Sequence, residues 1–146
     1  MYDIFVAELQ CPNCRTVHTA DAYTNMQTYI RSYPDSSAIG IGFIFEPREL
    51  TTKNIINARY KVIAEPSPGG PIRLLNTWIC PACNTEQWAM VTIADGRLQQ
   101  VEGVTMSRAT LEAANYISDI DADLLAERYA PPDAENSIDI LRRHLP

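Results

Sequence analysis

Two short cysteine pairs constrain this chain more than any other feature. The first is Cys11-Pro-Asn-Cys14 and the second is Cys80-Pro-Ala-Cys83, and the 146 residues contain no other cysteine. Two cysteines separated by two residues can direct both sulfurs to one metal ion about 2.3 Å away. We therefore expect Cys11, Cys14, Cys80 and Cys83 to be the four ligands of one tetrahedral site.

Zinc with a structural role is the metal that we expect at this site. Four thiolates close a tetrahedral shell and leave no open position for water or a substrate. A redox dithiol, an iron site of rubredoxin type and free buried thiols are the alternatives. The 65 residues between Cys14 and Cys80 exceed the roughly 15 to 20 of compact zinc modules, but the cost of closing a loop grows only logarithmically with its length.

We call each cysteine pair with its turn a knuckle. Strand-favouring residues lead into and out of both knuckles, over residues 6–19 and 75–93, so the sequence resembles zinc-ribbon proteins with a long β-rich insertion between the two halves. The resemblance implies only the four cysteines as ligands. Where zinc ribbons commonly have glycine after each pair, this chain has Arg15 and Asn84, and asparagine adopts the left-handed backbone more readily than arginine. We therefore expect the first knuckle to be less regular. The layout also resembles small uncharacterised bacterial proteins, which imply no activity.

The hydrophobic pattern predicts a β-rich body over residues 1–106. In residues 38–45, apolar residues alternate with period two and are expected to share one face of a strand. Residues 48–58 give a mixed signal, typical of a loop or a short helix. The expected strands are residues 4–10, 16–19, 38–45, 60–65, 72–79, 86–94 and 97–102.

Two turn signals join these strands into hairpins. Asp95-Gly96 is a strong two-residue hairpin turn, because both central positions of such a turn need positive φ. The stretch Pro66-Ser-Pro-Gly-Gly-Pro71 predicts a hairpin loop between residues 60–65 and 72–79. We therefore expect an antiparallel sheet built from hairpins, with the metal site at its end.

From Ser107 onward the pattern becomes helical. Four apolar residues recur at spacings of four, three and four, which predicts one buried helical stripe: Ala113, Ile117, Ile120 and Leu124. Ser107 is the expected N-cap, and Ser118 is an alternative cap that would divide residues 108–129 into two helices.

A last helix is expected after Pro131-Pro132, capped by Asp133 and carrying Ile138, Leu141 and Leu145. A strand-rich body followed by helices is the α+β pattern. We expect one domain over residues 1–146, with a helical segment over residues 107–146.

The charge of the chain disfavours nucleic acid and anionic lipid as partners. There are 12 Lys plus Arg against 18 Asp plus Glu, a formal charge of -6. Residues 107–146 hold four arginines and eight acids, so most of the negative charge lies in the helical segment. We expect a protein partner with a basic surface there, contacted by Asp119, Asp121, Asp123 and Glu127. Binding to nucleic acid would require a local patch formed by Arg15, Arg31, Arg48, Arg59 and Arg73.

Motifs for catalysis are weak. His18-Thr-Ala lacks the glutamate of zinc deaminases, and the acids at 119, 121 and 123 lack the glycine and final glutamate of a calcium loop. His18, four residues after Cys14, could replace a metal ligand, but with four cysteines present it is expected to be exposed on a strand. His144 is expected to lie near the negative end of a helix. Trp78 and Trp88 are expected to pack in the core beside the metal.

These observations favour a non-enzymatic, zinc-stabilised protein–protein interaction module, such as a small regulator or a toxin-neutralising immunity protein. A nucleic-acid-binding zinc ribbon and an enzyme, either a CxxC redox protein or a hydrolase, are the alternatives. No apolar run is long enough to span a membrane, and the first residues lack the basic and apolar parts of a secretory signal. The expected compartment is the cytoplasm.

Overall fold

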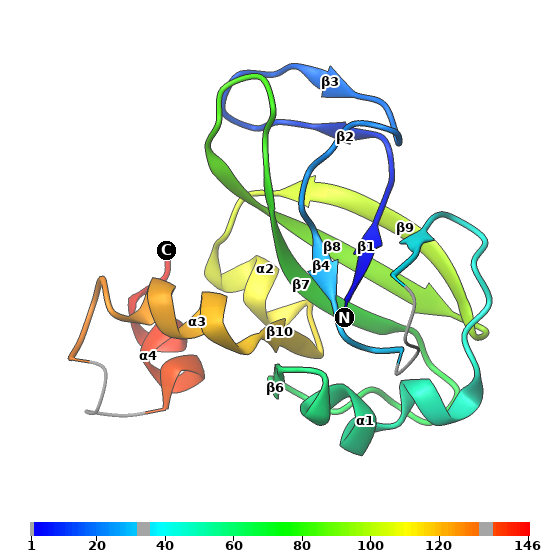
Figure 1. The fold of residues 1–146 in the computed structure, drawn as a ribbon. Coiled ribbons are helices and arrows are strands. Elements are labelled where there is room, and N and C mark those ends of the chain that lie inside the picture. Colours follow the sequence, from blue (N-terminus) through cyan, green and yellow to red (C-terminus); the bar gives the residue numbers. More distant parts are fainter. Residues whose placement is uncertain (1, 32–35, 132–135) are drawn as a thin grey trace.

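The chain folds into three β-sheets with four α-helices, as seen in a computed structural model that describes residues 2–31, 36–131 and 136–146 (Figure 1). This is the α+β class expected from the sequence. The largest sheet has five strands, a smaller one has three, and a two-stranded ribbon carries the first knuckle. Within the described residues, no helix is long and apolar enough to cross a membrane.

The five-stranded sheet is built around a long meander. β7 (Ile72–Ile79), β8 (Glu86–Ala94) and β9 (Arg97–Val104) pair in antiparallel order, which confirms the strands expected there. Asp95 and Gly96 form the turn between β8 and β9 with φ of 53° and 73°, the positive values that this turn requires. The second knuckle joins β7 to β8, so a hairpin of two long strands presents it.

The order of the strands corrects the expected hairpin at residues 60–79. β6 (Tyr60–Val62) does not pair with β7, because β10 (Tyr116–Ser118) lies between them. β10 runs antiparallel to β6 and parallel to β7, so the sheet is mixed. Residues 66–71 therefore connect two strands that are separated by a third.

β10 also shows that a continuous helix over residues 108–129 is wrong. Tyr116 and Ile117 are both fully buried. They point to opposite faces of the sheet, and both faces are covered at this central strand. Ile120 and Leu124 are 57% and 54% exposed, so the expected stripe is not the buried face of a helix. Three residues of strand are too few for hydrophobic periodicity to distinguish them from part of a helix.

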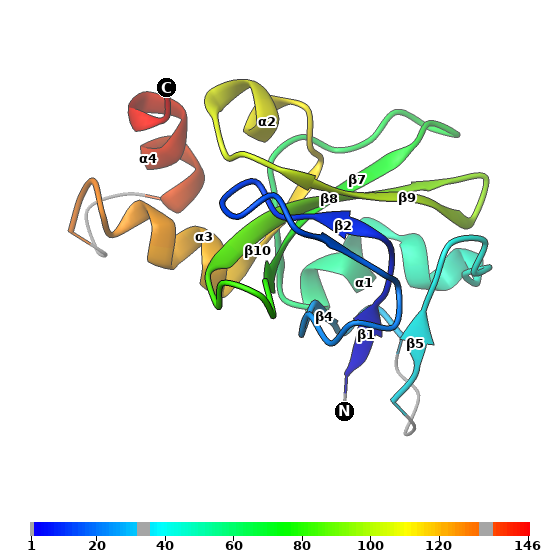
Figure 2. The same cartoon turned by 90° about the horizontal axis from the view of Figure 1, so that it is seen from above.

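The remaining residues of this segment form helices that cover one face of the large sheet (Figure 2). They are α2 (Arg108–Glu112), α3 (Asp119–Ala126) and α4 (Ser137–His144). Ser107 caps α2 by accepting from the N–H of Thr110, as expected. Asn136 caps α4, whereas Pro132 and the expected cap Asp133 lie outside the described residues.

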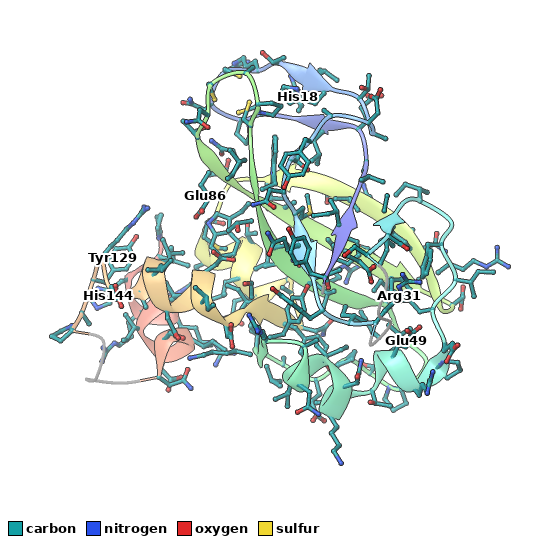
Figure 3. The ribbon with its side chains drawn as sticks, viewed as in Figure 1. His18, Arg31, Glu49, Glu86, Tyr129 and His144 are labelled. Atoms are coloured by element: carbon teal, nitrogen blue, oxygen red, sulfur yellow. The ribbon has the colours of Figure 1, made fainter. Side chains whose placement is uncertain are left out.

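The other face of the large sheet is covered by the N-terminal strands. β1 (Asp3–Phe5) pairs with β4 (Gln27–Thr28) and β5 (Ala38–Ile39). Asp3 accepts two hydrogen bonds from Arg31, at 2.9 and 3.0 Å, and Figure 3 shows Arg31 well away from His18 and the knuckles.

The strand expected over residues 38–45 ends after Ile39. Gly42 has a φ of +90°, which turns the chain, and Ile41 is 58% exposed instead of facing the core. Ile44 then forms only an isolated bridge to Arg97. Residues 48–58, which gave a mixed signal, form a 3₁₀ turn (Pro47–Leu50) and α1 (Thr52–Asn57).

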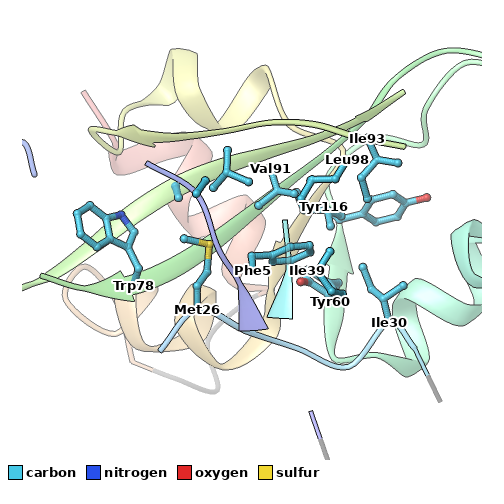
Figure 4. Packing of buried hydrophobic residues seen from close by; sticks show 14 of the residues in the cluster. Phe5, Met26, Ile30, Ile39, Tyr60, Trp78, Val91, Ile93, Leu98 and Tyr116 are labelled. Carbon is cyan, nitrogen blue, oxygen red and sulfur yellow. The ribbon is translucent and has the colours of Figure 1, made fainter. Parts of the chain in front are cut away.

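The large sheet separates two hydrophobic cores, and adjacent residues of β7 face different ones. Leu74 faces the N-terminal strands, whereas Leu75 faces the helices. The first core contains the largest buried side chains, among them Phe5, Met26 and Trp78 (Figure 4). Trp78 is fully buried, as expected, and its indole N–H donates to the carbonyl of Trp88 at 3.1 Å. Trp88 is only half-buried and packs against the second core, on the side of the helices, so the position expected for it is wrong. The first core joins the N-terminal residues to the strands that present the second knuckle.

Candidate metal centre

The two knuckles have the same backbone geometry. In each, the N–H of the first cysteine donates to a carbonyl five residues later at 3.0 Å, and the N–H four residues later donates back at 2.8 Å. Arg15 and Asn84 follow the pairs with φ of 65° and 55°, the left-handed region in which zinc ribbons commonly use glycine. The first knuckle is therefore as regular as the second, contrary to expectation, although arginine is the less favourable residue for this conformation.

The four cysteine sulfurs form one cluster, in which each lies within 4.8 Å of every other. Cys11 Sγ is 3.8 Å from Cys83 Sγ, and Cys14 Sγ is 3.7 Å from Cys80 Sγ. A tetrahedron with metal–sulfur bonds of about 2.3 Å has edges of about 3.8 Å. Disulfides require about 2.05 Å, so the geometry is that of four ligands around one ion.

The surroundings of the sulfurs differ across the site. Cys11 and Cys80 are buried, Cys83 is half-buried and Cys14 is exposed. β2 (Leu9–Gln10) and β3 (Val17–His18) hold the first knuckle against the end of the β7–β8 hairpin, at the top of Figure 1. The site therefore joins two parts of the chain at one end of the sheets, as expected.

Hydroxyl and amide groups surround the two more accessible sulfurs. A threonine two residues after the second cysteine of each knuckle places its hydroxyl near that sulfur: Thr16 is 3.3 Å from Cys14 Sγ, and Thr85 is 3.0 Å from Cys83 Sγ. The side-chain amide of Asn13 donates to Cys83 Sγ at 3.5 Å, across the two knuckles. Such outer partners orient metal ligands and stabilise their charged form.

Hydrogen bonding and burial shift the pKa values of the thiols in opposite directions. Hydrogen bonding from Thr85, and then from Asn13, lowers the pKa of Cys83 to about 6, and Thr16 lowers that of Cys14. Burial raises the pKa of Cys80 to about 11. Because a thiolate is the form that binds metal, an ion entering the site must displace a proton from the buried thiol.

His18 is the residue that sequence reasoning placed wrongly. It lies on β3, at the top of Figure 3, and is half-buried rather than exposed. Its Nε2 lies 3.1 Å from Cys80 Sγ, and its ring meets the Trp78 ring edge-on with a centroid distance of 6.2 Å. In the tautomer protonated at Nε2 it donates to the sulfur. Its position four residues after Cys14, on the strand returning from the knuckle, is the signal that made it the alternative ligand, and it contacts a ligand sulfur instead of replacing one of the four cysteines.

The acids expected to contact a partner lie on or next to α3, away from the knuckles. Asp121 accepts from Thr77 and Ser118 at 3.0 and 2.7 Å. Ser118 is the N-cap residue of α3, which confirms the alternative of two helices, but its hydroxyl donates to Asp121 instead of accepting from an N–H of the helix. Asp123 forms an ion pair with Lys61 at 2.7 Å. Asp119 is half-buried at the start of α3, and Glu127 is exposed after its end.

The arginines that nucleic-acid binding would require are in part engaged elsewhere. Arg31 is largely buried in its pair with Asp3, and Arg48 pairs with Glu46 at 2.6 Å. The guanidinium of Arg59 lies over the ring of Tyr29, 4.4 Å from its centroid. His144, at the C-terminal end of α4 as expected, stacks on Tyr129 with a centroid distance of 5.3 Å.

No protein family, curated protein or solved structure matches this chain. The site consists of four soft sulfur donors, close enough together to bind one metal ion. Zinc and iron are the ions that tetrahedral sulfur sites of this kind suit.

Proposed function

We propose that this protein is a non-enzymatic, zinc-stabilised protein-binding module whose partner presents a basic surface. The proposal of a structural zinc ion rests on the four sulfurs, which lie at the distances of a complete tetrahedral shell. A complete shell has no coordination position for a substrate. The ion then acts by holding the two knuckles together.

The charge on α3 supports the choice of partner. Asp119, Asp121, Asp123 and Glu127 lie within nine consecutive residues, and Lys61 is paired with one of them. Opposite charge on a partner accelerates diffusional encounter and disfavours wrong partners. Small regulators and toxin-neutralising immunity proteins are proteins of this kind.

The metal is tested by elemental analysis of protein purified without added metal or chelator. We expect one Zn²⁺ per chain and no visible absorption. If the purified protein contains iron and shows the visible absorption of a ferric tetrathiolate, the site is an iron site of rubredoxin type and the assignment of zinc is wrong.

The partner is tested by cross-linking in the native cell and by measuring the association rate of the captured protein. Changing Asp119, Asp121, Asp123 and Glu127 together to their amides should slow association at low salt by more than about tenfold, since steering depends on local charge. A matched variant carries the same change at four exposed acids elsewhere: Glu8, Glu65, Asp95 and Glu102. Equal rates for the two variants would contradict the proposal.

A further inference from the structure

A cavity of 270 Å³ opens beside the start of α3, between that helix and β4. None of the four cysteines lines it, and it is bounded by residues from β4, β6, β7, β8, β10 and α3. Pockets for drug-sized molecules measure about 300 to 1,000 Å³. The cavity therefore suits a single side chain better than a larger ligand.

Three carboxylates line this cavity: Glu86, Asp119 and Asp121. Asp121 is fixed by the hydroxyls of Thr77 and Ser118, which both donate to its Oδ2. Burial, together with the charge of Asp121, raises the pKa of Glu86. Asp119 and Asp121 are half-buried and Glu86 is exposed, so the walls hold neighbouring acids whose mutual repulsion an incoming cation would relieve.

The cations of this region have other contacts. Arg59 lines the cavity, but its guanidinium lies over the Tyr29 ring. Lys61 contacts Asp123 at 2.7 Å and Ser137 at 3.0 Å, outside the cavity. Arg128 lies near enough to Glu86 to favour its charged form, an effect smaller than that of burial and of Asp121. Acids therefore outnumber cations at the walls.

Exposed apolar side chains border the same opening. Ile79 and Ile120 line the cavity and are 38% and 57% exposed, and Leu124 lies one turn of α3 beyond Ile120. Figure 3 shows Glu86 on the side of the molecule where α3 lies. An acidic cavity beside an exposed apolar edge matches a partner segment that carries a cation next to apolar residues.

We propose that the cavity between α3 and β4 binds one arginine or lysine side chain of the partner, while Ile120 and Leu124 pack against apolar residues next to it. The inference rests on the proposed function and assigns its contact site. Buried, well-packed pockets that take an arginine are frequent at the energetic centre of protein interfaces. The ion pair forms with Glu86 and Asp121, and α3 supplies the apolar contact.

The test uses short capped peptides as probes of the metal-loaded, isotope-labelled protein. One pentapeptide has a central arginine flanked by leucines, and matched peptides carry lysine, glutamine or glutamate at the centre. We expect the arginine and lysine peptides to shift the amide resonances of Glu86 and residues 118–121. The glutamine peptide should bind about tenfold more weakly, because it leaves the carboxylates unpaired.

Variants of the protein complete the test. Glu86→Gln and Asp121→Asn should each weaken the arginine peptide by about tenfold, whereas Glu65→Gln, an exposed acid that does not line the cavity, should have no effect. Leu124→Ser should weaken the binding of every peptide that binds the unchanged protein. Equal binding of the arginine and glutamine peptides, or equal binding by Glu86→Gln and Glu65→Gln, would overturn the inference.

The captured partner separates this inference from the proposed function. If Glu86→Gln weakens its binding, the cavity is the contact site. If the partner binds Glu86→Gln and Asp121→Asn unchanged, the cavity is not the contact site, and the proposed function still stands on the four-acid variant. If the four-acid variant also binds unchanged, both proposals fail.

Discussion

The two knuckles have one backbone geometry but are built on very different supports. The second is presented by β7 and β8, strands of eight and nine residues that belong to the five-stranded sheet. The first is presented by β2 and β3, a ribbon of two residues on each side. A two-stranded ribbon is marginal by itself in water. The comparison shows that the same turn needs little local structure when another part of the molecule positions it.

The N-terminal residues are connected to the large sheet in three ways. The four cysteine sulfurs, close enough together to bind one metal ion, connect the knuckles, and Phe5 and Met26 pack in the core shared with β7. Hydrogen bonds form the third connection: Tyr60 binds Thr28 and Asn76 through its hydroxyl, at 3.1 and 2.9 Å. Each connection can be tested separately.

Removing the metal should have the largest effect. Structural zinc in small peptides contributes about 10–16 kcal/mol of apparent binding free energy, comparable to the stability of a whole domain. We expect a strong chelator to lower the thermal unfolding midpoint steeply. By hydrogen exchange, residues 9–19 should lose protection first, whereas β7 to β9 should keep theirs longer. An unfolding midpoint that stays unchanged after the metal has been removed would contradict this.

The core contact should have the next largest effect. Phe5 is fully buried on β1, so Phe5→Ala should lower the free energy of unfolding by about 3–5 kcal/mol, measured by urea denaturation. Ile41→Ala is the control, since Ile41 is mostly exposed and a change there should stay within about 0.5 kcal/mol. Similar losses for the two variants would show that this core does not stabilise the N-terminal strands.

The Tyr60 connection should be sensitive to alkaline pH. Burial raises the pKa of Tyr60 from 10.0 to about 12. Because the folded state favours the neutral phenol, its contribution is complete below pH 10 and is lost as the pH rises towards 12, by roughly 3 kcal/mol in total. Tyr60→Phe should remove this part of the pH dependence. A tyrosinate absorbance titration showing every tyrosine ionising near pH 10 would be incompatible with this burial.

The smallest effect should come from the residues that follow the cysteine pairs. Arg15 and Asn84 both have positive φ, a conformation that glycine adopts without cost. Arg15→Gly should stabilise the protein by up to about 1 kcal/mol, and Asn84→Gly by less, because asparagine tolerates this region better. Urea denaturation of the metal-loaded variants measures both. A larger gain at Asn84 would reverse the expected difference between the knuckles.

Local signals are what made parts of this fold predictable. Asp95-Gly96 and the alternating residues on either side are contiguous in the sequence, so β8 and β9 could be located from it. The cysteine spacing similarly identified the four sulfurs that meet. Ser107 was recognisable as a cap because its partner, the N–H of Thr110, is three residues away.

Features that depend on distant residues were not predictable. β10 is a strand because β6 and β7 flank it, and nothing in Tyr116–Ser118 itself distinguishes it from a helix. The contact of His18 with Cys80 depends on the meeting of the two knuckles, and the acidic character of the cavity depends on Glu86 lying near Asp121. Such pairs arise only when the sheets have formed.

The position of β10 sets an order for folding during synthesis. All four cysteines have been synthesised once Cys83 is added, so the knuckles can meet around a metal ion while the C-terminal helices are still absent. β7 lacks its neighbour on one side until Tyr116–Ser118 follow, and β6 has no partner in the sheet until then. The nascent chain therefore carries an open strand edge for some thirty residues of translation, the stage at which binding by a chaperone would protect it most.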